Sequence, residues 1–177
     1  MVSDIFEQLF YKTILGEIIM KLKIGDKAPN FHATLQDNTR FSIYSLLGKW
    51  VVLYFYPKDN TPGCTNEACN FRDNMERITS LGVDVIGVSP DSPKSHQGFI
   101  NKYNLNFKLI SDENKEICEL YGVLGEKTMF GKKVFGVVRS TFIIDDKGII
   151  KYIFPKVKVD GHVEEVINKL KELMDNK

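Results

Sequence analysis

The chain has 177 residues, and its 24 lysines and arginines nearly balance 23 aspartates and glutamates, so the formal net charge is +1. A hydrophobic fraction of 43% is typical of a globular domain and excludes a wholly disordered chain. The balanced charge argues against a nucleic-acid partner, and no stretch approaches the roughly 20 apolar residues that span a bilayer. Three cysteines are too few for a disulfide scaffold and favour a reducing compartment, for which we expect the cytoplasm.

Residues 1–21 differ from the rest of the chain and are expected to form an N-terminal extension. Asp4 and Glu7 occupy the place of the basic region of a signal peptide, and no small-residue cleavage site follows. Two interpretations stay open: an accessory extension, or a helix that docks onto a partner or a second subunit. The second interpretation rests on apolar residues at near-helical spacing, namely Val2, Ile5, Phe6, Leu9, Phe10, Ile14 and Ile18.

Residues 22–177 alternate between strand-like and helix-like patterns and are predicted to form one domain. Residues 31–35 and 40–42 flank a polar turn, which predicts a hairpin. Residues 50–56 show no polar alternation, which is typical of a central strand covered on both faces. The alternation predicts an α/β fold, with a central mixed β-sheet flanked by helices. Further strands are predicted at 83–89, 141–144 and 149–154, and helices at 65–81, 93–103, 114–121 and 162–174.

The junction between the strand at 50–56 and the helix at 65–81 is where we expect chemistry. In α/β folds, ligands bind outside the carboxyl ends of the strands. A Thr-Pro-Gly turn begins at Thr61, so Cys64 is predicted at or just before the N-terminus of the helix. Free backbone N–H groups and the helix dipole stabilise a thiolate there, and the thiolate is the nucleophilic form of cysteine.

A second cysteine, Cys69, follows Cys64 on the same predicted helix. Ideal helix geometry separates the two Cα atoms by about 8.7 Å and turns the side chains about 140° apart. A disulfide requires Cα atoms within roughly 7 Å. Cys69 is therefore either a core residue, or it bonds to Cys64 only after the segment 64–71 opens.

The third cysteine and the histidines indicate no second site. Cys118 fits one face of a short helix and is expected to pack in the core. His32, His96 and His162 show no ligand spacing with the cysteines, so no zinc or other metal site is predicted. The three histidines are expected to be surface or capping residues.

Motifs that bind nucleotides are absent from the sequence. There is no Gly-x-Gly-x-x-Gly, and the segment 125–132 has one residue too many for a P-loop. No cofactor is therefore expected. Lys132 and Lys133 are interpreted as part of a solvated loop.

The segment around Cys64 also resembles the signature of a known family. Pro57-x-x-x-Thr61-x-x-Cys64 is similar to the active-site signature of peroxiredoxins. The longer Thr61-Pro-Gly-Cys-Thr-x-Glu-Ala-Cys69 resembles the subfamily called PrxQ or bacterioferritin comigratory protein. The extension at 1–21 departs from the usual start of the family. The resemblance covers residues 23–174, with further motifs at 25–31, 88–91, 121–123, 136–142 and 161–163.

The resemblance implies a thioredoxin-like fold and a thiol-dependent peroxidase that reduces hydrogen peroxide and alkyl hydroperoxides in antioxidant defence. It makes Cys64 the peroxidatic cysteine, which is oxidised to a sulfenic acid. It makes Cys69 the resolving cysteine, which forms an intramolecular disulfide with Cys64. Thioredoxin or a similar dithiol protein is the implied reductant. A monomer is the expected state, with a dimer through the N-terminal extension as the alternative.

Residues around Cys64 acquire expected roles from the same resemblance. Thr61 is expected to accept a hydrogen bond from the peroxide or donate one to it, and Arg139 to stabilise the thiolate and hold the peroxide. Taken alone, Arg139 would be interpreted as a member of a surface ion pair. Pro57 is expected to make the loop rigid and shield the thiolate, or simply to shape a turn. Glu67 is interpreted either as a charge in the first helical turn or as a member of the site.

Three other functions stay open on the sequence. A dithiol–disulfide oxidoreductase of the thioredoxin type would need Cys-x-x-Cys, which the spacing of Cys64 and Cys69 does not supply. A chaperone or binding protein would use the N-terminal extension. A one-cysteine peroxidase follows if Cys69 is buried and inert.

Overall fold

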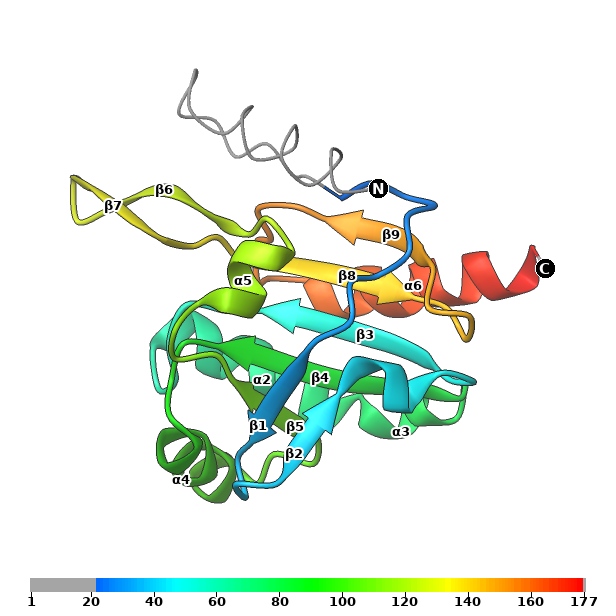
Figure 1. Ribbon diagram of the computed structural model, residues 1–177, viewed down its shortest axis with the longest axis horizontal. Helices are drawn as coiled ribbons and strands as arrows, with labels where there is room; N and C mark the ends of the chain where they lie inside the picture. Colours follow the sequence, from blue (N-terminus) through cyan, green and yellow to red (C-terminus); the bar gives the residue numbers. More distant parts are fainter. Residues whose placement is uncertain (1–21, 177) are drawn as a thin grey trace.

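A computed structural model describes residues 22–176, and a seven-stranded β-sheet forms their centre (Figure 1). Its three adjacent strands from the middle of the chain run parallel to one another, and all other neighbours are antiparallel. The predicted mixed sheet is therefore confirmed. In spatial order, the strands are β2 (Arg40–Ser42), β1 (His32–Leu35), β5 (Lys108–Ser111), β4 (Val83–Ser89), β3 (Trp50–Phe55), β8 (Ser140–Ile144) and β9 (Ile150–Phe154).

Helices cover both faces of the sheet. Alternate residues of β3 point to opposite faces, so Val52 and Tyr54 join one hydrophobic cluster while Val51 and Leu53 join the other. Every residue of β3 is buried, as its unbroken apolar pattern predicts. The first cluster contains residues of α2 (Pro62–Asp73), α3 (Met75–Thr79), α4 (Pro93–Tyr103) and α6 (His162–Asp175), and the second contains residues of η2 (Ile43–Leu46) and α5 (Glu116–Leu120).

A separate hairpin of β6 (Leu124–Met129) and β7 (Lys132–Val137) projects from the body of the domain (Figure 1). Lys132 and Lys133 are exposed, but the prediction that they lie in a loop is wrong, because they begin β7. Neither strand of this hairpin was expected from the sequence, and neither was β5. The other predicted elements, apart from the helix at 65–81, agree with the structure within two residues at each end.

The predicted helix at 65–81 is two helices in the structure. The first begins at Pro62, which suits the first helical position because proline lacks the N–H that would be unpaired there. It ends before Asn74, whose side-chain amide donates to the carbonyl of Asn70 at 2.8 Å and competes with the helical ladder. Cys64 consequently lies at the N-terminus of α2, within its first turn, which is one of the two predicted positions.

Two of the three histidines lie in the core, contrary to the prediction of surface or capping positions. His96 and His162 expose 0% and 2% of their surface. The Nε2 atom of His162 lies 2.8 Å from the hydroxyl oxygen of Thr141. Burial lowers the pKa of His162 to about 4, with a further lowering by the charge of Arg139. His162 is therefore neutral near pH 7.

Candidate active site

The junction of β3 and α2 places Cys64 in the first turn of a helix. Thr61 is the residue before the helix, and its carbonyl accepts the first helical hydrogen bond, from the N–H of Thr65 at 2.9 Å. The N–H groups of the first turn have no partner within the helix and point toward its N-terminal end. Together with the helix dipole they favour a negative charge on the Cys64 sulfur.

Four of the five residues predicted for the site line one pocket of about 700 Å³, which lies at this junction. They are Pro57, Thr61, Cys64 and Arg139. Cys69 does not line the pocket. The pocket walls also carry four lysines and a single carboxylate, Asp91, among apolar residues; the lysines are Lys58, Lys115, Lys127 and Lys156. An excess of cationic side chains favours the thiolate and attracts anions.

Arg139, directly before β8, joins Cys64 to a buried carboxylate. Its Nη2 atom lies 3.3 Å from the Cys64 sulfur, and its Nη1 atom donates to Glu67 Oε1 at 2.8 Å. The interpretation of Arg139 as a surface ion pair is wrong, because the side chains of Arg139 and Glu67 are 16% and 0% exposed. Gly63 makes room for the guanidinium, since a Cβ atom there would lie 3.2 Å from Nη2.

Arg139 stays charged in this setting. Burial alone would lower its pKa, but the neighbouring groups Glu67 and Cys64 outweigh burial and raise it. A permanent positive charge therefore faces the sulfur of Cys64. Such a charge stabilises both a thiolate and the oxyanion that leaves when a peroxide bond breaks.

Glu67 belongs to the site, although the sequence left its role open. It lies in the second turn of α2, not the first, and its Oε2 atom has no hydrogen-bond partner among the described residues. Burial raises the pKa of Glu67 to about 7, against the opposing effect of Arg139. The sequence did contain one signal, because Cys64 and Glu67 are three residues apart and share a helix face.

The hydroxyl of Thr61 is held by its own loop. It donates to the carbonyl of Lys58 at 2.9 Å and makes no capping bond to α2. A hydroxyl has one hydrogen and two lone pairs, so a committed hydrogen leaves the oxygen free to accept. Thr61 can therefore accept a hydrogen bond from a ligand in the pocket.

The other two cysteines differ sharply in environment. Cys69 is half-buried and lies in the uninterrupted helix α2 with Cys64, and both thiols are free. The helical geometry that separates the two residues is thus present. Cys118 is fully buried, as predicted, and its pKa is raised by burial and then by Asp112. A thiol in that state is a poor nucleophile.

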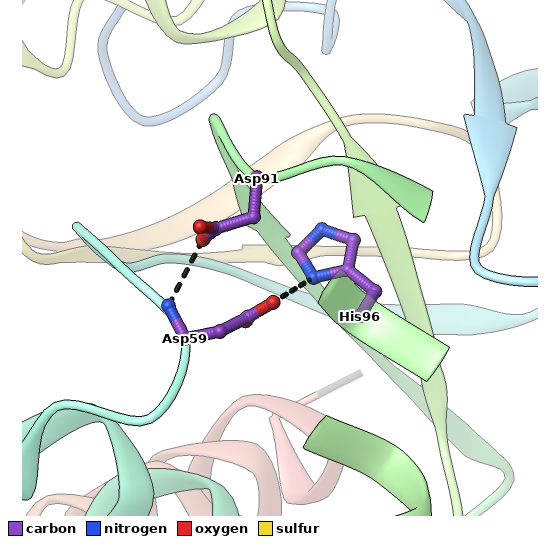
Figure 2. Close-up of side chains that lie close together, drawn as sticks. All are labelled: Asp59, Asp91 and His96. Atoms are coloured by element: carbon purple, nitrogen blue, oxygen red, sulfur yellow. Dashed lines mark hydrogen bonds and ion pairs between the residues drawn. The ribbon is translucent and has the colours of Figure 1, made fainter. Parts of the chain in front are cut away.

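Asp59, Asp91 and His96 form a polar cluster next to the pocket, and Asp91 is also part of the pocket wall (Figure 2). Each offers a potential metal-ligand atom, and these atoms lie within 4.8 Å of one another. However, His96 Nε2 lies 2.9 Å from the carbonyl of Ile110 and Nδ1 lies 2.7 Å from Asp59 Oδ2. A carbonyl only accepts, so Nε2 carries a proton, and Nδ1 is engaged by the carboxylate of Asp59. We interpret the cluster as a structural one, whose hydrogen bonds connect the loop before α2 to α4 and β5.

The mixed sheet flanked by helices is typical of the thioredoxin-like class. Within this fold, Cys64 lies at a helix N-terminus and faces Arg139 in a pocket, which indicates a thiol-based enzyme. The sequence pattern of the AhpC/TSA family matches residues 24–153, so the chain belongs to that family. It is 52% identical to a putative peroxiredoxin bcp from Coxiella burnetii over 85% of this chain and 100% of that protein. It is 45% identical to peroxiredoxin Bcp from Escherichia coli K12, over 85% of this chain and 97% of the relative.

Solved structures agree with this assignment. A PrxQ variant from Xylella fastidiosa superposes with a TM-score of 0.82 at 39% identity, covering 86% of this chain and 98% of that chain. A Xanthomonas campestris bacterioferritin comigratory protein, described for its alkyl peroxide reduction activity, gives 0.76 at 39% identity, covering 80% and 90%. The thioredoxin-like fold and the resemblance to PrxQ are thereby confirmed.

The activity of the chain follows from its family. It is a thiol-dependent peroxidase, which takes a hydroperoxide as substrate and a thiol as reductant. This outcome favours the peroxidase over the dithiol oxidoreductase and the binding protein. None of the helices between residues 22 and 176 combines the length and the hydropathy that a membrane span requires.

Proposed function

We propose that Cys64 is the peroxidatic cysteine and that Arg139, Thr61 and Pro57 assist it. One observation carries the proposal: the guanidinium of Arg139 lies 3.3 Å from the Cys64 sulfur. Thr61 and Pro57 line the same pocket, so a small peroxide there meets all four residues. Pro57 stiffens the loop and limits access of water to the sulfur.

In the first step, the Cys64 thiolate attacks one oxygen of the peroxide and the O–O bond breaks. The sulfur is oxidised by two electrons to a sulfenic acid, and the peroxide is reduced. The leaving oxygen departs with the bonding electron pair, takes up a proton and becomes water or an alcohol. Arg139 stabilises the negative charge on that oxygen, while Thr61 accepts a hydrogen bond from the peroxide O–H.

In the second step, the thiol of Cys69 condenses with the sulfenic acid of Cys64. A disulfide forms and water leaves. Because both residues lie in α2, the N-terminal half of this helix must open first. A dithiol protein such as thioredoxin then reduces the disulfide by exchange, which suits the reducing environment of the cytoplasm.

The organisation of the chain completes this proposal. Residues 22–177 form the catalytic domain, which acts as a monomer. Residues 1–21 form an accessory extension, and they lie outside the described residues. If the extension instead pairs two subunits, its removal will halve the mass measured by light scattering.

A competition experiment tests the two-cysteine cycle. The reduced protein receives less than one equivalent of hydrogen peroxide in a large excess of a simple thiol, and a non-reducing peptide map locates the oxidised sulfur. We expect a disulfide between Cys64 and Cys69. Linkage of Cys64 to the added thiol would favour the one-cysteine peroxidase, and oxidation of the added thiol alone would show that Cys64 is not activated.

Substitutions assign the individual roles. Cys64→Ser is expected to abolish peroxide reduction. Arg139→Ala is expected to slow the attack on peroxide by about 10²- to 10³-fold, as for other charge-stabilising donors. The denaturation midpoint of the variant is the control. A fall in stability that matches the fall in rate would remove the support for a catalytic Arg139.

A further inference from the structure

The peptide group between Lys58 and Asp59 is bonded at both ends. Its carbonyl oxygen accepts from the Thr61 hydroxyl at 2.9 Å, and its N–H donates to Asp91 Oδ2 at 2.9 Å. A peptide group is planar and rigid, so the direction of its N–H sets the direction of its carbonyl. Asp91, from the loop after β4, is therefore linked to Thr61 through one rigid unit.

The direction of the Thr61 hydroxyl matters for the reaction. While the Lys58 carbonyl takes the hydroxyl hydrogen, the oxygen presents its lone pairs and can accept from a peroxide. If the peptide group turned, the Lys58 carbonyl would no longer accept the hydrogen of the Thr61 hydroxyl. The hydroxyl could then point its hydrogen toward the peroxide and would no longer be fixed as an acceptor. A hydroxyl held in advance costs no reorganisation during the reaction.

Asp91 is itself held firmly. Its Oδ2 atom, which binds the Asp59 N–H, also accepts from the Ser89 hydroxyl at 2.6 Å. The side chain of Asp59 bonds to His96, while the backbone N–H of Asp59 bonds to Asp91 (Figure 2). The loop is therefore fixed at Asp59 by these two hydrogen bonds. A bond between an ionised carboxylate and a backbone N–H is stronger than a neutral one.

We propose that Asp91 is a positioning residue for peroxide reduction, which acts through the Lys58–Asp59 peptide group on the hydroxyl of Thr61. The inference rests on the role proposed above for Thr61. The inference also explains why Asp91, the single carboxylate of the pocket lining, lies among lysines. Without such a role, a negative charge near the thiolate would be unfavourable.

Two substitutions of Asp91 separate its hydrogen bond from its charge. Asp91→Ala removes the acceptor, and we expect the rate constant of Cys64 oxidation by hydrogen peroxide to fall about tenfold. Asp91→Asn keeps an oxygen that accepts from the Asp59 N–H, so its rate should stay within about threefold of the wild type. An Asp91→Asn variant as slow as Asp91→Ala would overturn the positioning by this hydrogen bond.

A double-mutant cycle with Thr61→Val tests whether the effect passes through Thr61. We expect Thr61→Val to slow oxidation and Asp91→Ala to add no further loss in that background. If the two losses multiply, Asp91 acts independently and the inference fails, while the role of Thr61 stands. If Thr61→Val reacts as fast as the wild type, the proposed role of Thr61 fails, and the inference fails with it.

Ser111→Ala is the matched control. It removes the hydrogen bond of 2.6 Å from the Ser111 hydroxyl to the backbone carbonyl of Asp91. The carboxylate of Asp91 and its bond to the Asp59 N–H stay in place. Its oxidation rate should stay within about twofold of the wild type, with the denaturation midpoint of every variant measured in parallel. Equal slowing in Ser111→Ala and Asp91→Ala would show a general effect of loop stability and would overturn the inference.

Discussion

The carboxyl group of Glu67 lies 2.8 Å from the guanidinium of Arg139, and both side chains are largely withdrawn from solvent. The same guanidinium faces the sulfur of Cys64. One cation thus contacts both the carboxyl group of Glu67 and the sulfur of Cys64. Because burial raises the pKa of Glu67 to about 7, its protonation leaves more of the charge of Arg139 available to the thiolate.

Replacing Glu67 with glutamine should therefore change how the oxidation rate depends on pH. Glu67→Gln keeps an oxygen for Arg139 but cannot ionise. Below about pH 6, both proteins have a neutral side chain and similar rates; above about pH 8, only the wild type carries the competing charge. We expect the rate ratio of variant to wild type to rise about threefold to tenfold across this range.

Glu164→Gln provides the matched control for this measurement. Glu164 is an exposed carboxylate that pairs with Arg77 on the surface and does not line the pocket of Cys64. Its replacement should leave the rate ratio level with pH. A level ratio for Glu67→Gln as well would show that Glu67 does not compete with Cys64 for Arg139.

His162 predicts a loss of stability in acid. Its pKa is about 4 in the folded protein, against 6.5 for the unperturbed side chain. Between these values the unfolded chain binds more protons, so the free energy of unfolding falls as the pH falls from 6.5 to 4. The contribution reaches up to about 3 kcal/mol, since one pKa unit corresponds to about 1.4 kcal/mol.

The measurement compares urea unfolding of the wild type and His162→Gln across this range. As the pH falls, the free energy of unfolding of the wild type should fall more steeply than that of His162→Gln, because glutamine does not titrate. His32→Gln, at an exposed position, is the control and should run parallel to the wild type. Parallel curves for His162→Gln would contradict the lowered pKa. Glu67, whose pKa is raised, makes the free energy of unfolding rise as the pH falls. This effect is the same in the wild type and in His162→Gln, so it cancels in the comparison.

Much of the fold could be predicted because strands and helices carry local patterns. The unbroken apolar run of β3 and the proline at the start of α4 identified those elements correctly. The hairpin of β6 and β7 was missed because its turn residues, Phe130 and Gly131, both have positive φ angles of 51° and 75°. Phenylalanine rarely adopts that conformation, so its presence did not indicate a hairpin turn.

The site was predictable where its chemistry lies in one segment. Cys64 and Thr61 belong to a single motif, and the resemblance added Arg139. The buried histidines could not be predicted, because their partners are distant in sequence: Asp59 lies 37 residues before His96. The burial of Glu67 likewise depends on the packing of α2 and on Arg139, 72 residues later.

Gly87 in β4 should not tolerate a larger residue. A Cβ atom there would lie 2.8 Å from a methyl group of Leu109 and 2.9 Å from the ring of Tyr54, both fully buried. We expect Gly87→Ala to destabilise the protein by about 1–3 kcal/mol through overpacking. Gly98→Ala is the control, because Gly98 is exposed in α4 with open space at its Cβ position and should gain about 0.5–1 kcal/mol. Urea unfolding measures both values, and equal stability of the two variants would show that β4 can shift.

Oxidation should open the first turns of α2. The Cα atoms of Cys64 and Cys69 lie about 8.7 Å apart in an ideal helix, whereas a disulfide needs roughly 7 Å or less. After one equivalent of hydrogen peroxide, backbone amides of the segment 64–71 should exchange at least about tenfold faster with deuterium, while those of α6 keep their protection. Cys69→Ser cannot form the disulfide and should keep its protection after oxidation. If the disulfide forms in the wild type without faster exchange in this segment, the two cysteines meet by a distortion other than unwinding.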